Sequence, residues 1–243
     1  MKKILLAIFI LIAATPIFAQ WPWQWERVDG NGKLVKEKRE ASGYTAISSS
    51  GAWDVMVAYG ESNSIEVEGD ENLLSYISTK VEGGKLVIKT TKNVNLRSKN
   101  KITIYVSLTK LTGLSLSGSG SVMGNGKFGN EGSTDFHISG SGNIRLTFNK
   151  LDKIKVGVSG SGSLHLAGSA SSVDAHISGS GNADCSEVIC DDAAARVSGS
   201  GNVKLNANKS VEANISGSGN VSYRGAASDI RKHISGSGKL SKV

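Results

Sequence analysis

Residues 136–148 read FHISGSGNIRLTF, a run in which apolar and polar side chains alternate on both sides of the tetrapeptide Ser-Gly-Ser-Gly. The even positions that flank the tetrapeptide carry Phe136, Ile138, Ile144, Leu146 and Phe148, and the odd positions between them are polar. Alternation with a period of two is typical of a β-strand with one buried face. The run therefore predicts two short strands joined at SGSG, with the even positions facing a core.

The SGSG tetrapeptide occurs seven times, at intervals of 18 to 22 residues. Each copy follows an apolar residue, and a second apolar residue lies two positions after its last glycine. A coil of about twenty residues cannot bury its apolar face alone, whereas coils stacked about 4.8 Å apart bury one continuous column. The period therefore predicts an all-β fold, a parallel, right-handed β-helix (solenoid) of short strands with about seven coils. The seven copies start at Ser117, Ser139, Ser159, Ser178, Ser198, Ser216 and Ser235.

Two features of the repeat leave alternatives open. The alternation places Gly140 and Gly142 on the inward side, where glycine either lets two sheets approach closely or supplies corner torsions that a side chain forbids. Asparagine follows the tetrapeptide in four copies, and these amides either stack as a ladder or reflect the turn preference of asparagine. The four are Asn143, Asn182, Asn202 and Asn220.

Residues 28–116 lack the SGSG repeat but are also rich in alternating, strand-like runs. The sequence EGGK at 82–85 predicts a hairpin turn, and Asp70 predicts the N-cap of a helical turn over 70–74. We expect this part to join the repeats at 117–243 in one domain, residues 28–243, and to cover the open end of the stack. An exposed solenoid end would offer strand edges for aggregation.

The N-terminus has the form of a secretory signal peptide. Lys2 and Lys3 precede the apolar run 4–14, which is shorter than the ~20 residues of a membrane span, and Ala19 supplies a small residue for cleavage. We expect residues 1–19 to be removed and a tryptophan-rich segment to follow at 20–27. The mature protein is then exported, either periplasmic or secreted to the cell surface, with no transmembrane segment after cleavage.

The charge balance argues against a nucleic-acid partner. The chain carries a formal charge of +7, and its densest basic cluster, within residues 33–39, is interrupted by Glu37 and followed by Glu40. No nucleic-acid-binding module accompanies this cluster. It therefore predicts a solvated strand face.

Three segments occur in an order that resembles a known family: IEVEGDENLL at 65–74, GKLVI at 84–88, and the repeated ISGSGN. They resemble the putative auto-transporter adhesin head GIN domain family (DUF2807), over nearly everything after residue 19. The resemblance implies an exported β-helical protein, mostly of Bacteroidota, with no catalytic residues to carry over. The family name also implies a membrane barrel after the head, whereas this sequence stops at Val243, so the word adhesin rests on analogy of fold.

The histidines and glycines do not predict a metal or cofactor site. His137, His176 and His233 each lie two positions before an SGSG, which places them in one column of the solenoid. His137 and His176 would lie about 9.6 Å apart in non-adjacent coils, too far to share a tetrahedral zinc with bonds near 2 Å. The sequence GNGKFG at 124–129 matches the dinucleotide fingerprint, but no amphipathic helix follows it.

Four carboxylates, Asp184, Glu187, Asp191 and Asp192, cluster near one coil. Glycan cleavage by two carboxylates also needs a cleft with aromatic platforms, so a decorated loop is the simpler interpretation. We therefore expect no catalytic residues and no cofactor. The expected function is a non-enzymatic cell-envelope protein, an adhesin-like binding or structural module whose partner is an envelope protein or a glycan.

Two alternatives to this function stay open. The first is a polysaccharide-active enzyme on the same scaffold, which a carboxylate pair in a groove lined by Trp53 or Tyr59 would favour. The second is a soluble subunit that docks to another envelope protein through Trp21, Trp23 and Trp25.

Cys185 and Cys190 are the only two thiols of the chain. A separation of five residues can let a loop return within bonding distance, so we expect a disulfide between them in an oxidising compartment. The opposing interpretation is a buried free thiol, because Cys185 falls in the inward column of the leucines at 146, 166 and 205.

Overall fold

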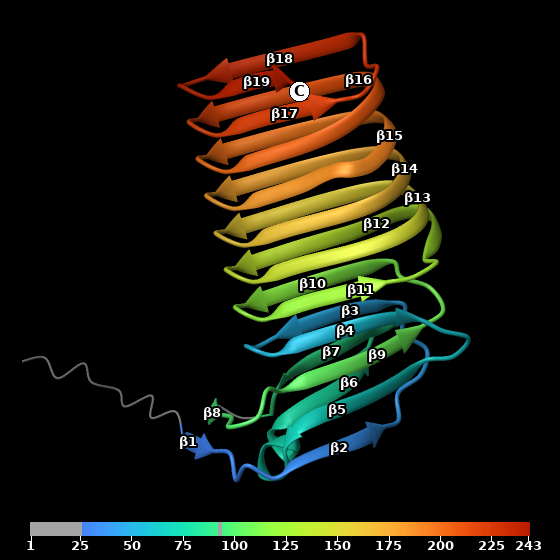
Figure 1. The fold of residues 1–243 in the computed structure, drawn as a ribbon, viewed down its shortest axis with the longest axis vertical. Coiled ribbons are helices and arrows are strands. Elements are labelled where there is room, and N and C mark those ends of the chain that lie inside the picture. The colour runs from blue at the N-terminus through green and yellow to red at the C-terminus, as the bar shows by residue number, and fades with distance from the viewer. Residues whose placement is uncertain (1–25, 92–93) are drawn as a thin grey trace, which may run out of the picture.

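The computed structural model describes residues 26–91 and 94–243, so the signal peptide expected at 1–19 and the tryptophans at 21, 23 and 25 lie outside the described residues. In that part of the chain the structure holds β-strands and one short 3₁₀ helix, η1 (Glu71–Tyr76) (Figure 1). None of its helices has the length and apolar character that a membrane span requires. The strands before the repeats are β1 (Glu26–Asp29), β2 (Leu34–Arg39), β3 (Ala46–Ser50), β4 (Asp54–Tyr59), β5 (Ser64–Asp70), β6 (Ile77–Glu82), β7 (Lys85–Thr90), β8 (Val94–Arg97) and β9 (Thr103–Leu108).

The repeats form a parallel stack, which confirms the all-β solenoid. The first glycines of the first six SGSG copies lie in register, and the seventh copy is in register with the sixth through its first serine. Six turns of about 20 residues separate the copy at Ser117 from the copy at Ser235. The strands of this part are β10 (Gly113–Gly118), β11 (Ser121–Asn125), β12 (Gly129–Gly140), β13 (Asn143–Gly160), β14 (Ser163–Gly179), β15 (Asn182–Gly199), β16 (Asn202–Gly217), β17 (Asn220–Arg224), β18 (Asp229–Ser235) and β19 (Lys239–Lys242).

The strands of the central coils are longer than the sequence predicts. We expected two short strands in each coil, but β13 to β16 are single strands of 16 to 18 residues that end only at SGSG. The second corner of each coil keeps its ladder of hydrogen bonds and bends through register shifts, for example between Thr147 and Lys150. Such bulges let a strand turn without ending.

The two glycines of each SGSG have different structural roles. The first has φ between +98° and +122° in all seven copies, a conformation that L side chains rarely adopt. The second has no positive φ, but a Cβ at Gly142 would lie 2.7 Å from the carbonyl oxygen of Gly120 in the coil below. Both geometries left open by the sequence therefore occur, a corner at the first glycine and a close approach of coils at the second.

The structure adds a coil that a search for SGSG misses. β3 and β4 pair in parallel with β10 and β11, and Ser50-Gly51-Ala52-Trp53 occupies the place of the tetrapeptide. Trp53 stands where the second glycine would be, and its ring folds over Gly51, where a Cβ would lie 2.5 Å from the indole. The stacked architecture thus begins within the segment that lacks the repeat.

Antiparallel strands close the N-terminal end of the stack, at the bottom of Figure 1. β7 and β9 continue the parallel stack below β3 and β4, after which β6 pairs antiparallel with β7, β5 with β9, and β2 with β5. The hairpin predicted at 82–85 joins β6 to β7. The helical turn predicted after Asp70 is also present as η1, although the Asp70 side chain makes no capping hydrogen bond to it.

Candidate binding surfaces

The histidine column predicted from the sequence is present on the outside of the stack. The register places His137, Gly157, His176 and Arg196 side by side on consecutive strands. Together with the outward residues two positions earlier they form a surface that we call the histidine face. It consists of Asp135, His137, Lys155, Asp174, His176 and Arg196.

The histidine face is hollowed by an open groove of about 590 Å³ that is lined from β7, β3, β10 and β12 to β15. His137 leans over Gly157, where a Cβ would lie only 2.6 Å from its Nδ1 atom, so the glycine makes room for the imidazole. One nitrogen of Arg196 lies 3.2 and 3.3 Å from the two carboxylate oxygens of Asp174. Among the described residues no group of three or more His, Cys, Asp or Glu side chains is arranged to hold a metal ion. The face is thus a polar surface with charges of both signs.

The four clustered carboxylates on β15 are each held by a neighbouring coil. Asp184 pairs with Lys204 at 3.2 Å and Asp191 with Lys209 at 2.9 Å. Glu187 faces His165 at 3.7 Å, and Asp192 accepts a hydrogen bond of 2.6 Å from the Ser210 hydroxyl. Burial by itself would raise the pKa of Asp184, but hydrogen bonds from Ser186 and Lys204 hold it below its ordinary value. The four carboxylates thus form ion pairs and hydrogen bonds that link neighbouring coils.

The aromatic side chains that the enzyme alternative requires beside these carboxylates lie elsewhere in the structure. Trp53 is buried and donates its indole N–H to the Ser49 hydroxyl at 2.9 Å, so it offers no platform. Tyr59 is 48% exposed and meets Phe128 edge to face, but its strand β4 is four strand spacings, about 19 Å, from β15. The structure does not bring these aromatics to the carboxylates.

The asparagines after SGSG form a hydrogen-bonded ladder in three consecutive coils. Asn202 donates to the Asn182 side-chain oxygen at 2.9 Å, and Asn220 donates to Asn202 at 3.1 Å. The ladder stops below Asn182, because the preceding coil carries Ser163 at this position. The amide-ladder interpretation is therefore confirmed for these three residues.

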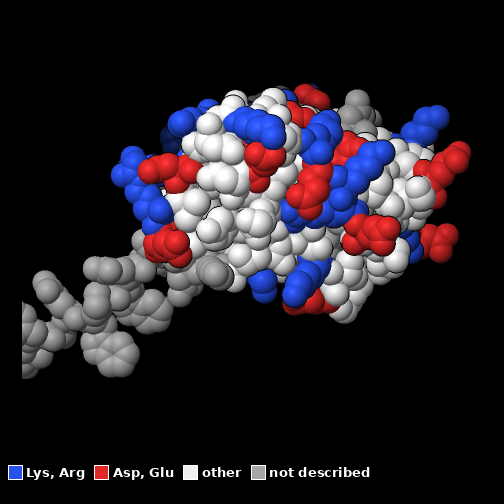
Figure 2. All heavy atoms as spheres, turned by 90° about the horizontal axis from the view of Figure 1, so that it is seen from below, with Lys and Arg blue, Asp and Glu red and all other residues white. Residues whose placement is uncertain are grey.

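The basic cluster of the N-terminal end is interspersed with acidic side chains (Figure 2). Lys36 lies 3.7 Å from Glu66 and 3.1 Å from Glu68, while Arg39 lies 3.1 Å from Glu37. Charges paired in this way do not build the one-signed field that attracts a nucleic acid. The arrangement is that of a solvated strand face.

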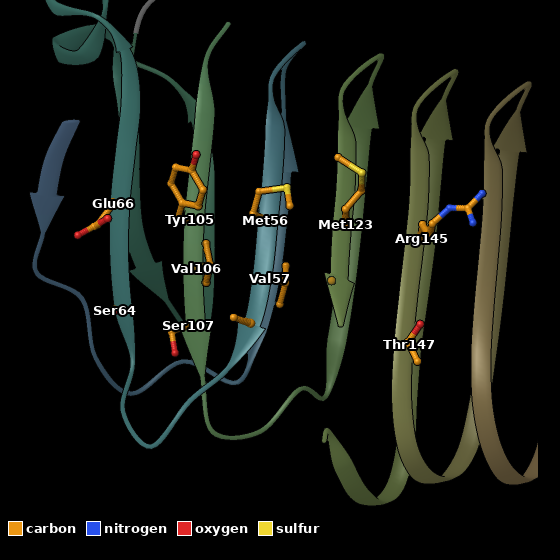
Figure 3. A pocket seen from close by; sticks show the side chains of 12 residues that line it. Met56, Val57, Ser64, Glu66, Tyr105, Val106, Ser107, Met123, Arg145 and Thr147 are labelled. Atoms are coloured by element: carbon orange, nitrogen blue, oxygen red, sulfur yellow. The ribbon is translucent and has the colours of Figure 1, made fainter. Parts of the chain in front are cut away.

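A second groove, of about 450 Å³, was not predicted from the sequence (Figure 3). Its centre is a row of three large side chains in register on three strands, Tyr105 on β9, Met56 on β4 and Met123 on β11. The row is bounded by Glu66 on β5 and Arg145 on β13. We call this surface the methionine groove. The sequence contains one sign of this groove, two methionines at outward-facing positions of their strands. This sign can be recognised only once the coil of β3 and β4 is aligned with the repeats.

The two cysteines are buried, free thiols in the structure. Burial, with Asp184 nearby, raises the pKa of Cys185, and burial with Asp192 and Asp191 nearby raises that of Cys190 to about 12. Cys190 Sγ lies 3.4 Å from the carbonyl oxygen of Asp192. Thiols of this kind react slowly, because the thiolate is the reactive form.

The disulfide between Cys185 and Cys190 stays a prediction. Protein recovered from an oxidising compartment is expected to show no titratable thiol in denaturant without prior reduction. Reduced protein is expected to release both thiols to a thiol reagent only when it unfolds, because burial protects them. Two thiols titrated in the unreduced, denatured protein would contradict the bridge.

Comparisons with known proteins agree with this β-solenoid architecture. The family model described as "Putative auto-transporter adhesin, head GIN domain" (DUF2807) matches residues 43–227. A structure from Parabacteroides distasonis, described as a putative lipid binding protein, is 26% identical with a TM-score of 0.73, covering 90% of this chain and 100% of that one. No curated protein matches the chain.

Two further solved structures, both described as putative adhesins, share the fold. The one from Bacteroides fragilis is 21% identical with a TM-score of 0.76, covering 89% of this chain and 100% of that one. The one from Parabacteroides merdae is 22% identical with a TM-score of 0.64, covering 90% and 99%. Since the family model spans most of the solenoid and of its antiparallel end, this chain belongs to the DUF2807 family, the head GIN domain of putative auto-transporter adhesins.

Proposed function

We propose that this chain is an exported, non-enzymatic binding module of the cell envelope that holds a protein or glycan partner on its histidine face. Membership of an adhesin family supports an extracytoplasmic location. The observation that carries the proposal is the groove of the histidine face, which presents charges of both signs from hydrogen-bonded strands. Side chains fixed on strands lose little freedom on binding, which favours an extended contact.

The state of the carboxylates supports binding over glycan cleavage. A glycosidase needs one carboxyl group whose raised pKa keeps it protonated as the general acid. Asp184 has a lowered pKa, and Asp191 and Glu187 face a lysine and a histidine of neighbouring coils. These contacts link neighbouring coils.

Binding through the histidine face is expected to weaken gradually as the face is altered. The single variants Lys155→Glu and Arg196→Glu should each reduce partner capture a few-fold, and the double variant by about 10-fold or more, because binding energy spread over a surface is lost in parts. Quantitative pull-down from envelope extracts, beside titration on a glycan array, measures the effect. The matched control, Lys80→Glu with Lys232→Glu, makes the same charge change at exposed positions outside the face and should bind as the parent does.

Two results would contradict this proposal. Equal capture by the histidine-face double variant and its control would remove the face from the binding site. Loss of a measured glycan-cleaving activity on Glu187→Gln or Asp191→Asn alone would replace the binding module with the enzyme alternative, because a catalytic set loses orders of magnitude with one residue.

A lipid or other amphiphile is a second candidate ligand. The relative from P. distasonis, 26% identical, is described as a putative lipid binding protein. The methionine groove of this chain provides an apolar surface on the outside of the solenoid. The two candidate ligands would occupy different faces.

A further inference from the structure

The methionine groove interrupts an otherwise polar row of outward side chains. Starting from Arg145 and moving toward the C-terminus, the same row continues with His165, Asp184 and Lys204 on successive strands. In the opposite direction it changes to Met123, Met56 and Tyr105. Met56 is one of the few large apolar side chains of the described residues that are exposed, at 36%. An apolar break in a polar surface is typical of a binding site.

Small side chains lie beside this row near its β5 end. Ser107 and Ala58 lie on β9 and β4, two positions further along than Tyr105 and Met56, and Ser107 pairs with Ser64 on β5. These small side chains and the larger ones of the first row line the groove together. Tyr105 and Arg145 are three strand spacings apart, about 14 Å, so the groove suits a narrow, extended apolar chain.

The two ends of the groove differ in charge. At the β5 end, Glu66 lies within 3.7 Å of Lys36 and 3.9 Å of Lys38, and the Lys36 ammonium sits 4.2 Å from the centre of the Tyr105 ring. The charge of Glu66 at this end is therefore neutralised by lysines of the protein itself. At the other end Arg145 makes no ion pair with any described residue, and its side chain extends from β13 toward the next coil (Figure 3). Arg145 lines this end of the groove, and its guanidinium points away from Met123 (Figure 3).

We propose that the methionine groove binds a single-chain amphiphile with a carboxylate head group, its alkyl chain over Met123, Met56 and Tyr105 and its carboxylate on Arg145. This inference rests on the second candidate ligand above and specifies its chemistry and its orientation. Methionine side chains are flexible and polarisable, so they adapt to an alkyl chain. The planar guanidinium donates two parallel hydrogen bonds to a carboxylate.

The test titrates the mature protein with laurate below its micelle concentration, by calorimetry and by chemical-shift changes. Saturable binding is expected, with shifts confined to β4, β9, β11 and the start of β13. Arg145→Gln should weaken laurate binding about 10-fold or more, because a charge-assisted pair is lost. Met56→Asn combined with Met123→Asn should weaken it by a similar factor, since apolar area is lost. Arg224→Gln, an exposed arginine on β17, is the matched control and should bind as the parent does.

Two further ligands separate the outcomes. Dodecyltrimethylammonium has the same chain with a cationic head and should bind at least 10-fold more weakly, because Arg145 repels it. Absence of laurate binding, equal binding of the cationic amphiphile, or an unchanged affinity in Arg145→Gln would each overturn the inference. Binding to phosphatidylglycerol vesicles without binding to laurate would also overturn it, while leaving a lipid-binding function in place. Partner capture on the histidine face is unaffected by any of these results.

Discussion

Gly179→Val is expected to lower the free energy of unfolding by about 3–5 kcal/mol, from the combined cost of a forbidden torsion and a backbone clash. Gly179 has φ +114°, and a Cβ there would lie 2.7 Å from the carbonyl oxygen of Gly160 in the coil below. A β-branched side chain can neither adopt the torsion nor push away a backbone that is itself hydrogen-bonded in the stack. Gly160→Val should behave in the same way, with φ +110° and a contact of 2.6 Å to Gly140.

Two further variants show how far this effect depends on the position of the added side chain. Ser180→Val places the same side chain on an exposed neighbour and should change stability little. Gly238→Val alters the second glycine of the last coil, which has no positive φ although a Cβ there would meet the carbonyl oxygen of Gly219. It should cost less than Gly179→Val, because no forbidden torsion is involved and strands β18 and β19 are mostly exposed. Thermal and denaturant unfolding of the four variants measure the differences. Equal midpoints for all four variants and the parent would show that these glycines only fill space.

The repeated half of the fold could be predicted because its information is local and redundant. The alternation around SGSG fixes which side chains face inward, and seven copies fix the stacking. The coil of β3 and β4 escaped detection because Ala52 and Trp53 replace the second Ser-Gly of the tetrapeptide. The coil accommodates this replacement because the indole packs over Gly51, and only the fold shows that contact.

The candidate surfaces were predictable only where one column carries a recognisable residue type. The histidine column follows from counting back two positions from each SGSG, and the register confirms it. The methionine groove combines Glu66 and Tyr105, which enter through antiparallel pairing of β5 with β9, with Met123 of the repeats. Pairing between distant segments leaves no periodic trace in the sequence.

The role of Asp70 also depends on pairing between distant segments, so the sequence did not reveal it. Its replacement should destabilise the fold as much as replacement of a corner glycine. The carboxylate is fully buried and accepts four hydrogen bonds, from the N–H groups of Gly32, Lys99 and Asn100 and from the Asn100 side-chain amide. It thereby joins the loop before β2, the loop before β9 and the end of β5. Asp70→Asn directs an amide nitrogen at two of these donors and is expected to cost about 3–5 kcal/mol of unfolding free energy.

The pH dependence of stability distinguishes the Asp70 charge from simple packing. Burial alone would raise the pKa of Asp70, but the hydrogen bonds from Asn100, Lys99 and Gly32 outweigh it and hold the pKa below its ordinary value. Because the folded value is the lower one, the carboxylate stabilises the native state fully above the unfolded pKa of about 3.9, and this contribution is lost as the pH falls through the folded value. The difference in unfolding free energy between the parent and Asp70→Asn should therefore be constant from about pH 5 to 8 and shrink below about pH 4. Asp29→Asn, which removes an exposed carboxylate at the same end, is the control and should leave the profile unchanged. A gap between parent and Asp70→Asn that persisted undiminished into strong acid would mean that shape, and not the ionised carboxylate, holds these loops together.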